Sequence, residues 1–587
     1  MKHFYLSLLV FYISLSLCLA QPVISYWNND PIHKKTEENF KNGMQHGYFA
    51  EWYKSGQKAK EGNYTIGAED GLWKAWYENG KQKSEEKYVK GNKEGKCSYW
   101  YQNAKPAQIE FYKNGQPDST WLGWFEDGKE KSIENFKAME SKYSWVSVKS
   151  GHFLYYYSNG FKESEGDFEN DKQVKTFTKY FSTGKKQFEG EYKNGNRDGK
   201  WMYWHKNGNP KEERKYLTNE DCLIINFWTE DGKQYVKEGN GFYIFSDVQG
   251  AKIREGNLKS GREDGEWILW NRDGWKEHIV TFAAGKKEGK CANYFKDGKI
   301  KSEGNYSHDK KNGVWKFYRE DGTLEIDGTL KDDMQHGKWT YWFKTGKKDA
   351  EGYYKNDKQD SLWQYWYTKG PLWKKGWYKD GKKNGWWEFY YESGKKIEAG
   401  KFVDDKQDSL WTSWHSNGQK KDEGTFIKGV MNEKWTGWYE NGNINYDGMY
   451  VDSVKTGFWK YGFANGKPFQ QGNYKNGKQD GPWVYWFDTG IKESEGSYEN
   501  GGRDGKWNFY YETGGLYQEN NYKYGKLAGS IKTWSIDQKL VCEGHYAISR
   551  PNEKSEWVSL RHGEWIYYNE KGEVSRTETY KSGVKQQ

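Results

Sequence analysis

A repeat with a period of 24 residues constrains this chain more than any other feature. Residues 257–544 divide into twelve consecutive units of 24 residues without insertion or deletion. Position 11 of the unit is Trp in ten copies, with Cys291 and Ile531 as the exceptions, and position 18 is Gly in eleven copies, with Gln538 as the exception. A fixed period of 20–50 residues is typical of an array in which each unit packs against its neighbours.

Each unit is predicted to form one β-hairpin. Two runs of five to seven residues, rich in Trp, Tyr and Phe, are separated by a short x-x-Gly corner, such as Glu440–Gly442, and by a longer Asn-Gly…Asp-Gly corner, such as Asn476–Gly481. Such runs suit strands, and Gly and Asn tolerate the positive φ of hairpin turns. A single hairpin is marginal in water, so neighbouring hairpins must pair. The predicted fold class is all-β, an elongated single-layer antiparallel meander or solenoid of 24-residue β-hairpin repeats.

The alternation of side chains along a strand predicts the faces of the sheet. In Trp339–Phe343, positions 11, 13 and 15 are expected on one face and position 14 on the other. An aromatic residue at position 2 adds a second row, so ladders of rings should stabilise the sheet. The residues predicted to form the core of the repeat are Trp315, Trp339, Trp363, Trp387, Trp411, Trp435, Trp459, Trp483, Trp507, Gly346, Gly418 and Gly442.

The repeat resembles the MORN family, specifically the MORN-variant repeats of the YwqK-type antitoxin-like proteins of bacteria. The resemblance rests on the G-x-W-x-x-[WY]-[FY]-x-x-G-K core, as in Gly337–Lys347, and on the E-G-x-Y-K-N join, as in Glu495–Asn500. It extends over nearly the whole chain after residue 20, about 22 hairpin units. It implies a scaffold or interaction surface, and the antitoxin-like label implies neutralisation of a toxin as one alternative.

Changes in the repeat divide the chain into segments. The predicted segments are a signal peptide at 1–20, a lead-in at 21–38, a first array at 39–214 with an expanded corner at 135–166, irregular units with a possible kink at 215–256, the regular array at 257–544, and an expanded terminal unit with a C-terminal fragment at 545–587.

The N-terminus has the pattern of a secretory signal. Lys2 and His3 precede the apolar run Phe4–Leu19, and a small residue, Ala20, follows. Cleavage there would leave no transmembrane span and would place the chain outside the cytoplasm: secreted, periplasmic or at the cell surface. Two alternatives stay open, an uncleaved signal that anchors the chain and lipidation at Cys18.

The two expanded corners contain related sequences. Trp145–Gly151 and Trp557–Gly563 both begin Trp-Val-Ser and lie at the same corner, in front of the same strand. They are either extended hairpins that cap the sheet or recognition loops, since long ordered loops often carry function. If they are recognition loops, Trp145 and Trp557 are the candidate contact residues, because a fixed exposed ring supplies a large contact area.

Motifs for catalysis or ligand chemistry are not found in the sequence. No histidine pair has zinc spacing, and His46 and His336 replace the usual Asp in a corner. The segment from Asn194 to Asp198 imitates the start of a calcium loop, but position twelve of that loop is His205 where the motif needs Glu. We therefore expect no enzyme activity and no catalytic, metal-binding or cofactor-binding residues.

Composition and charge narrow the choice of partner. Aromatic residues make up 19% of the chain, and the 92 basic residues are nearly balanced by 83 acidic ones, which interleave within each unit. This balance disfavours nucleic acid. The most favoured function is a secreted or surface scaffold that binds another protein. Binding of carbohydrate or cell wall through aromatic ladders and toxin neutralisation are the alternatives, and the oligomeric state is unknown.

Overall fold

The computed structural model describes residues 21–28, 30–247, 249–550 and 552–587, so the predicted signal peptide lies outside the described residues. In these residues the chain forms 50 β-strands and no helix. The prediction of an all-β fold is confirmed.

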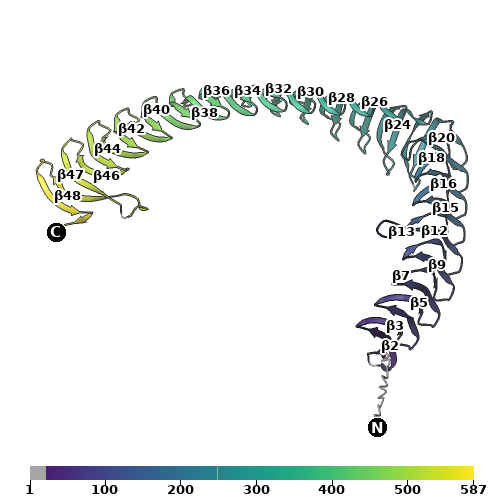
Figure 1. Ribbon diagram of the computed structural model, residues 1–587. Helices are drawn as coiled ribbons and strands as arrows, with labels where there is room; N and C mark the ends of the chain where they lie inside the picture. The colour runs from purple at the N-terminus through teal and green to yellow at the C-terminus, as the bar shows by residue number, and fades with distance from the viewer. Residues whose placement is uncertain (1–20, 29, 248, 551) are drawn as a thin grey trace, which may run out of the picture. The chain divides into compact units, whose positions relative to one another are not determined.

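The chain divides into two compact units. The first comprises the described residues up to Gly274 together with Thr281–Lys286, and the second comprises Trp275–Val280 and Lys287–Gln587. Within each unit the strands follow one another in chain order, and each long strand is antiparallel to the strand before it (Figure 1). Each unit is therefore a single-layer antiparallel meander, as predicted.

Long strands of about nine residues alternate with return strands of about eight, two per repeat. Strands of the first unit include β9 (Pro106–Lys113), β12 (Glu130–Glu140), β13 (Trp145–Lys149), β14 (Gly151–Tyr156), β18 (Asn196–Trp204), β19 (Pro210–Tyr216), β20 (Cys222–Trp228), β21 (Gln234–Lys237), β22 (Asn240–Ser246), β23 (Lys252–Lys259) and β24 (Arg262–Trp270). Strands of the second unit include β28 (Lys310–Tyr318), β30 (Met334–Trp342), β31 (Lys348–Lys355), β32 (Lys358–Trp366), β33 (Leu372–Lys379), β34 (Lys382–Tyr390), β35 (Lys396–Val403), β36 (Lys406–Trp414), β37 (Lys420–Ile427), β38 (Val430–Trp438), β39 (Ile444–Val451), β40 (Val454–Gly462), β41 (Pro468–Lys475), β42 (Lys478–Trp486), β43 (Lys492–Glu499), β44 (Gly502–Tyr510), β45 (Leu516–Lys523), β46 (Lys526–Trp534), β47 (Leu540–Ser549) and β48 (Val558–Tyr568).

Both corners of a repeat depend on positive φ. Between β31 and β32 the chain turns through Asn356 and Asp357, whose φ angles are 50° and 63°, as a two-residue type I′ hairpin requires. At the short corner after β30, Gly346 has φ 79°, and its N–H donates to the carbonyl of Phe343 at 2.9 Å. The recurring Asn, Asp and Gly residues of the sequence therefore lie in the turns.

A tryptophan lying on a glycine forms the core of ten of the twelve regular repeats. Trp363 is 1% exposed, and a Cβ added to Gly352, at position 24 of the preceding unit, would lie 2.1 Å from Trp363 Cδ2. The indole Nε1–H donates to the carbonyl of Tyr353 at 2.9 Å, so the buried ring keeps a hydrogen bond. The same contact recurs at Gly304/Trp315, Gly328/Trp339, Gly376/Trp387, Gly400/Trp411, Gly424/Trp435, Gly448/Trp459, Gly472/Trp483 and Gly496/Trp507.

Rings at positions 2 and 11 alternate edge-on along one face of the sheet. Tyr354 lies 5.1 Å from Trp363 at an interplanar angle of 89°, and Phe402 lies 5.0 Å from Trp411 at 86°. Position 13 lies on the same face, as the contact between Trp363 and Tyr365 shows. We call this face, with positions 2, 11 and 13, the ring face.

The prediction for position 15 needs correction. A register shift lies between Tyr341 and Trp342, and β30 ends at Trp342, so the strand alternation does not extend to Phe343. Position 15 lies in the short corner, where the hydroxyl of Tyr367 donates to the carbonyl of Tyr390, one repeat further on, at 2.8 Å. Where this position holds Tyr, as in Tyr367, Tyr391, Tyr439 and Tyr511, the hydroxyl links successive corners.

Candidate functional site

The face opposite the ring face carries a repeated charge pattern, and we call it the charged face. Its positions are 1, 10, 12, 14, 20 and 23 of the repeat. In a typical unit, Lys348 pairs with Glu351 at 2.6 Å and lies 5.7 Å from the ring of Trp366, at position 14 of the next unit. The charged groups of this face thus pair within one repeat and contact an aromatic ring of the next repeat. Because this pattern is the same in successive repeats, it offers no unique binding site for a partner.

Exposed aromatic and apolar side chains interrupt the charged face within β31–β36. Position 1 is polar or charged in nine of the twelve regular units and position 10 in six, and within β31–β36 four large side chains at these positions are 45–51% exposed. We call this group the exposed strip: Tyr353, Trp377, Trp386 and Leu410.

The backbone places the two exposed tryptophans on one face. Tyr378 and Trp387 pack together on the ring face at 5.1 Å, so their chain neighbours Trp377 and Trp386 point to the other side of the sheet. The core tryptophans, in contrast, are 0–6% exposed. Trp377 and Trp386 were not among the contact residues predicted from the sequence. Comparing the residues at positions 1 and 10 from unit to unit would have found them.

The first expanded corner forms an extended hairpin. β12 and β13 pair from Phe136↔Lys149 to Glu140↔Trp145. Trp145 is partly buried, and Lys113 Nζ, at the end of β9, lies 5.1 Å from its ring centroid.

The second expanded corner, between β47 and β48, holds Trp557 against the protein. Its ring stacks on Tyr524 at 5.1 Å and 20°, and the guanidinium of Arg550 lies 5.7 Å from it. Both candidate tryptophans are therefore partly covered by their own chain. Whether they also contact a partner stays a prediction.

A buried charge network accompanies the packed rings where the repeat loses its period, in β19–β22, as at Phe227 and Tyr243, whose ring centroids lie 4.9 Å apart. Glu212 is 3% exposed; it accepts hydrogen bonds from Arg214 Nη2 at 2.9 Å and from the hydroxyl of Tyr243 at 2.9 Å. Burial opposes the charge of Arg214, but Glu212 raises the pKa of Arg214 above its usual value. Burial, followed by the charge of Glu212, raises the pKa of Tyr243.

Next to this network, a pocket of about 310 Å³ is lined by Arg214, Cys222, Arg254 and Arg262. Arg254 pairs with Glu263 at 3.0 Å, and Arg262 pairs with Asp221 at 2.9 Å. Since each guanidinium in the lining has its own carboxylate, the pocket has no uncompensated positive charge.

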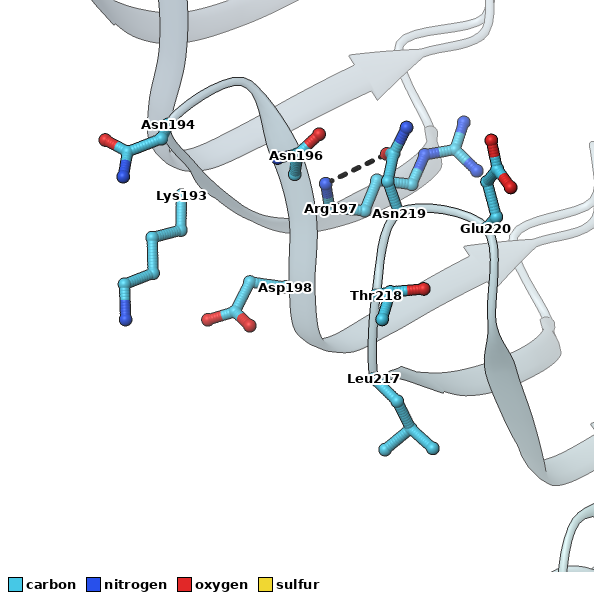
Figure 2. A pocket seen from close by; sticks show the side chains of 9 residues that line it. All are labelled: Lys193, Asn194, Asn196, Arg197, Asp198, Leu217, Thr218, Asn219 and Glu220. Carbon is cyan, nitrogen blue, oxygen red and sulfur yellow. Dashed lines mark hydrogen bonds between the residues drawn. The ribbon is translucent and has the colours of Figure 1, made fainter.

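A larger and more open pocket of about 580 Å³ lies at the corner around residues 193–198 and 217–220 (Figure 2). The backbone N–H of Arg197 donates to Asn219 Oδ1 at 3.2 Å. The carboxylates of Asp198 and Glu220 lie on opposite sides of the pocket in Figure 2 and do not converge on one point. Among the described residues, no group of three or more His, Cys, Asp or Glu side chains is placed to hold a metal ion.

The four cysteines outside the signal region are free. Cys97 and Cys291 are buried at position 11, where Trp is expected, and Cys222 and Cys542 are partly buried. Burial raises the pKa of the Cys97 and Cys291 thiols, so both behave as small apolar residues.

No helix in the described part of the chain has the length and apolarity that a membrane span needs.

Comparison with solved structures gives only distant similarity. The crystal structure of TcdB2-TccC3 aligns with 96% of this chain and 35% of its own, at 10% identity and a TM-score of 0.13. A structure of the Photorhabdus luminescens Tc holotoxin pore aligns with 95% of this chain and 34% of its own, also at 10% identity and a TM-score of 0.13. The chain thus spans about a third of the length of the structures it matches. No curated protein sequence matches it.

Comparison with protein families identifies the repeat. Seven segments match the family described as MORN repeat variant: residues 69–90, 197–217, 287–308, 311–332, 335–356, 503–524 and 561–582. The segment 335–356 covers β30 from its second residue, the short corner and β31, that is, one long strand and its return strand. The chain therefore contains repeats of the MORN variant type.

Proposed function

We propose that this protein is an extracytoplasmic, non-enzymatic repeat scaffold that binds another protein through the exposed strip on its charged face. The single observation that carries this proposal is the exposure of Trp377 and Trp386, at 49% and 50%, in a chain that buries its repeat tryptophans. Large rings fixed on a rigid sheet supply contact area at a low cost in conformational entropy, which is why Trp is enriched at binding hot spots.

Ion pairs border the exposed strip and provide a polar rim. Lys338 pairs with Glu351 at 3.1 Å next to Tyr353, and Lys375 pairs with Glu388 at 2.8 Å on β33 and β34. An apolar centre with a polar rim is the usual composition of a protein–protein interface. The signal-like residues 1–20 and the MORN-variant repeats also favour a scaffold outside the cytoplasm.

The proposal is tested by replacing both exposed tryptophans, Trp377→Ser and Trp386→Ser, and measuring the capture of proteins from an extract of the source organism. We expect capture of a specific partner to fall about tenfold or more, with unchanged thermal unfolding. Val314→Ser is the matched control, since Val314 also occupies position 10 and is 55% exposed but lies outside the strip. Equal capture by the double variant and the wild type would contradict the proposal.

A glycan is the second candidate for the same surface, because Trp377 and Trp386 lie on the neighbouring strands β33 and β34 and present two rings to solvent. Pull-down with insoluble cell-wall glycans separates the two candidates. Retention of the wild type but not of the double variant would favour the glycan over the protein partner.

Localisation has its own test. We expect a C-terminally tagged full-length chain in the extracytoplasmic fraction and a variant lacking residues 2–20 in the cytoplasm. Equal distribution of the two would contradict the proposed export.

A further inference from the structure

On the ring face, the row of aromatic residues at position 13 has a gap between Phe389 and Tyr461. At position 13, Tyr341, Tyr365 and Phe389 precede the gap, and Tyr461, Tyr485 and Phe509 follow it. In β36 and β38 the same position holds Ser413 and Gly437. The residue between them in the row is Asp422 on β37, which pairs with both of them in the sheet register.

The missing rings leave a pocket of about 310 Å³ on the ring face. Trp411, Phe426 and Trp435 contribute to its lining. Trp411 and Trp435 are 4% and 6% exposed, whereas Trp387 and Trp459, in the units on either side, are 0% and 1% exposed. Two core tryptophans, Trp411 and Trp435, thus contribute to the wall of this pocket.

Tyr446 forms one wall of the pocket in a fixed position. Its ring lies over Gly437, where an added Cβ would be 2.2 Å from Tyr446 Cε1. Its hydroxyl donates to Asp422 Oδ1 at 2.7 Å, and Ser413 Oγ donates to Asp422 Oδ2 at 3.1 Å. Asp422 thus holds the wall and places a carboxylate in the lining.

The units on both sides supply their own cation over the core tryptophan. Lys383 Nζ lies 4.9 Å from the Trp387 ring, and Lys455 Nζ lies 4.5 Å from the Trp459 ring, both from position 7. In the two units of the gap, position 7 holds Gln407 and Met431, which line the pocket. No lysine or arginine lines this pocket.

A second carboxylate faces the pocket without a partner. Glu398 on β35 is half-buried in the lining, and no other described residue forms a hydrogen bond or ion pair with its carboxylate. Burial raises the pKa of Glu398, and the charge of Lys383 only partly opposes this effect. Burial of a carboxylate is unfavourable unless a donor or a cation compensates it.

From this geometry we infer that the pocket binds an organic cation, an ammonium or guanidinium group, over the rings of Trp411 and Trp435 and beside the carboxylates of Glu398 and Asp422. Aromatic faces and carboxylates together recognise such cations through cation–π attraction and charge. The bound cation would lie over the core tryptophans as the ammonium groups of Lys383 and Lys455 do in the neighbouring units. This inference is independent of the proposed function, because the pocket and the exposed strip lie on opposite faces of the sheet.

The first test uses choline and its uncharged isostere 3,3-dimethylbutan-1-ol as probes, with the full chain and ligand-observed saturation-transfer NMR. We expect a saturable signal for choline. Its apparent dissociation constant should be at least about tenfold lower than that of the isostere. Equal binding of the two, or binding of neither choline nor the two cations named in the final test, would overturn the inference.

Two variants locate the site. Met431→Lys restores an internal cation over Trp435, as in the adjacent repeats, and should weaken choline binding about tenfold. Gln479→Lys is the matched control, because it adds the same charge over Trp483, where Tyr485 occupies position 13, and should leave binding unchanged. Glu398→Gln should weaken binding about fivefold without loss of thermal stability. Unchanged binding in Met431→Lys and Glu398→Gln, with both variants folded, would also overturn the inference.

The final test identifies the source of the cation by competition. N-acetyl-lysine-methylamide and N-acetyl-arginine-methylamide represent a side chain of a partner protein, and choline represents a free quaternary amine. Stronger binding of either amino acid amide than of choline, lost in Met431→Lys, would assign the pocket to a partner's side chain. The reverse order would assign it to a small quaternary amine.

Discussion

The regular array and the register break at β19–β22 hold the same kind of sheet together in different ways. In the array, each tryptophan lies on a glycine, and its Nε1–H is satisfied by a carbonyl ten residues earlier in the chain, as for Trp483 and Asn473. At the break, the buried carboxylate of Glu212 accepts hydrogen bonds from Arg214 and from Tyr243, which lies 31 residues after Glu212. Uniform spacing allows one apolar contact to be repeated. Where the spacing is lost, buried charges make the longer connections.

The largest effect is expected from removing one ring of the array. Trp483→Ala should lower the free energy of local unfolding by about 3–5 kcal/mol, because it leaves a cavity and an unsatisfied carbonyl. Hydrogen exchange of β41–β43 amides measures this loss. Since repeats couple mainly to their neighbours, protection in β28 and β30 should not change. Uniform loss of protection across both regions would contradict the expectation.

A somewhat smaller effect is expected at the register break. Glu212→Gln leaves the Arg214 guanidinium without its counter-charge in a buried position, and should cost about 3 kcal/mol of local stability. The matched control is Glu213→Gln next to it, whose ion pair with Lys200 at 2.9 Å is partly exposed and should contribute less than about 1 kcal/mol. Hydrogen exchange in β19–β22 compares the two. Equal losses would mean that the buried network has no special role.

Two glycines of one repeat should differ in their tolerance of alanine. Gly424 lies beneath Trp435, with an added Cβ 2.1 Å from Cδ2, so Gly424→Ala should cost about 2–3 kcal/mol by overpacking. Gly418 has φ +94° and space around it, so Gly418→Ala should cost only about 1 kcal/mol, from backbone strain. Local exchange in β36–β38 ranks the two, and the reverse ranking would show that turn conformation limits the repeat more than packing does.

The smallest effect is a pH dependence on the charged face. Partial burial disfavours ionisation of Glu388, but hydrogen bonds from Lys375 and Lys396 outweigh burial and lower its pKa to about 2. A carboxyl whose pKa is lower in the folded state stabilises the fold above its unfolded value of 4.5, and this contribution is lost as the pH falls from there to about 2. Glu388→Gln should therefore weaken the pH dependence of the local stability of β33–β35 in this pH interval. An unchanged pH profile would show that the ion pairs contribute nothing.

Much of the fold could be predicted from the sequence because the repeat presents the same evidence many times. The corners, the strands and the burial of Trp at position 11 follow from residue types and a fixed period. Strand alternation alone does not predict that position 24 must be glycine. This need arises because the Trp at position 11 of the next unit packs directly on it. A trace of it is present, however: where position 11 is Ile531 or Cys291, the preceding position 24 is Asn520 or Val280 instead of Gly.

The candidate sites were harder to predict, since they depend on departures from the repeat. Trp145 and Trp557 stood out as insertions, but both rings pack against Lys113 or Tyr524 of their own chain. Trp377, Trp386 and the gap at Ser413 are single substitutions at positions that vary between units. Only the faces of the folded sheet show which of these substitutions expose a ring or open a pocket.

The contact between tryptophan and glycine is the central element of this account, and a double-mutant cycle tests it most directly. The variants are Gly472→Asn, Trp483→Ile and the combination of both, which copies the natural pair Asn520 and Ile531, neighbours in β45 and β46. The measured quantity is the local opening free energy of β41–β42 from hydrogen exchange. We predict that the double variant is more stable than the sum of the single losses implies, by at least about 1 kcal/mol. Additive losses would show that the ring does not require the glycine beneath it, and would contradict the account.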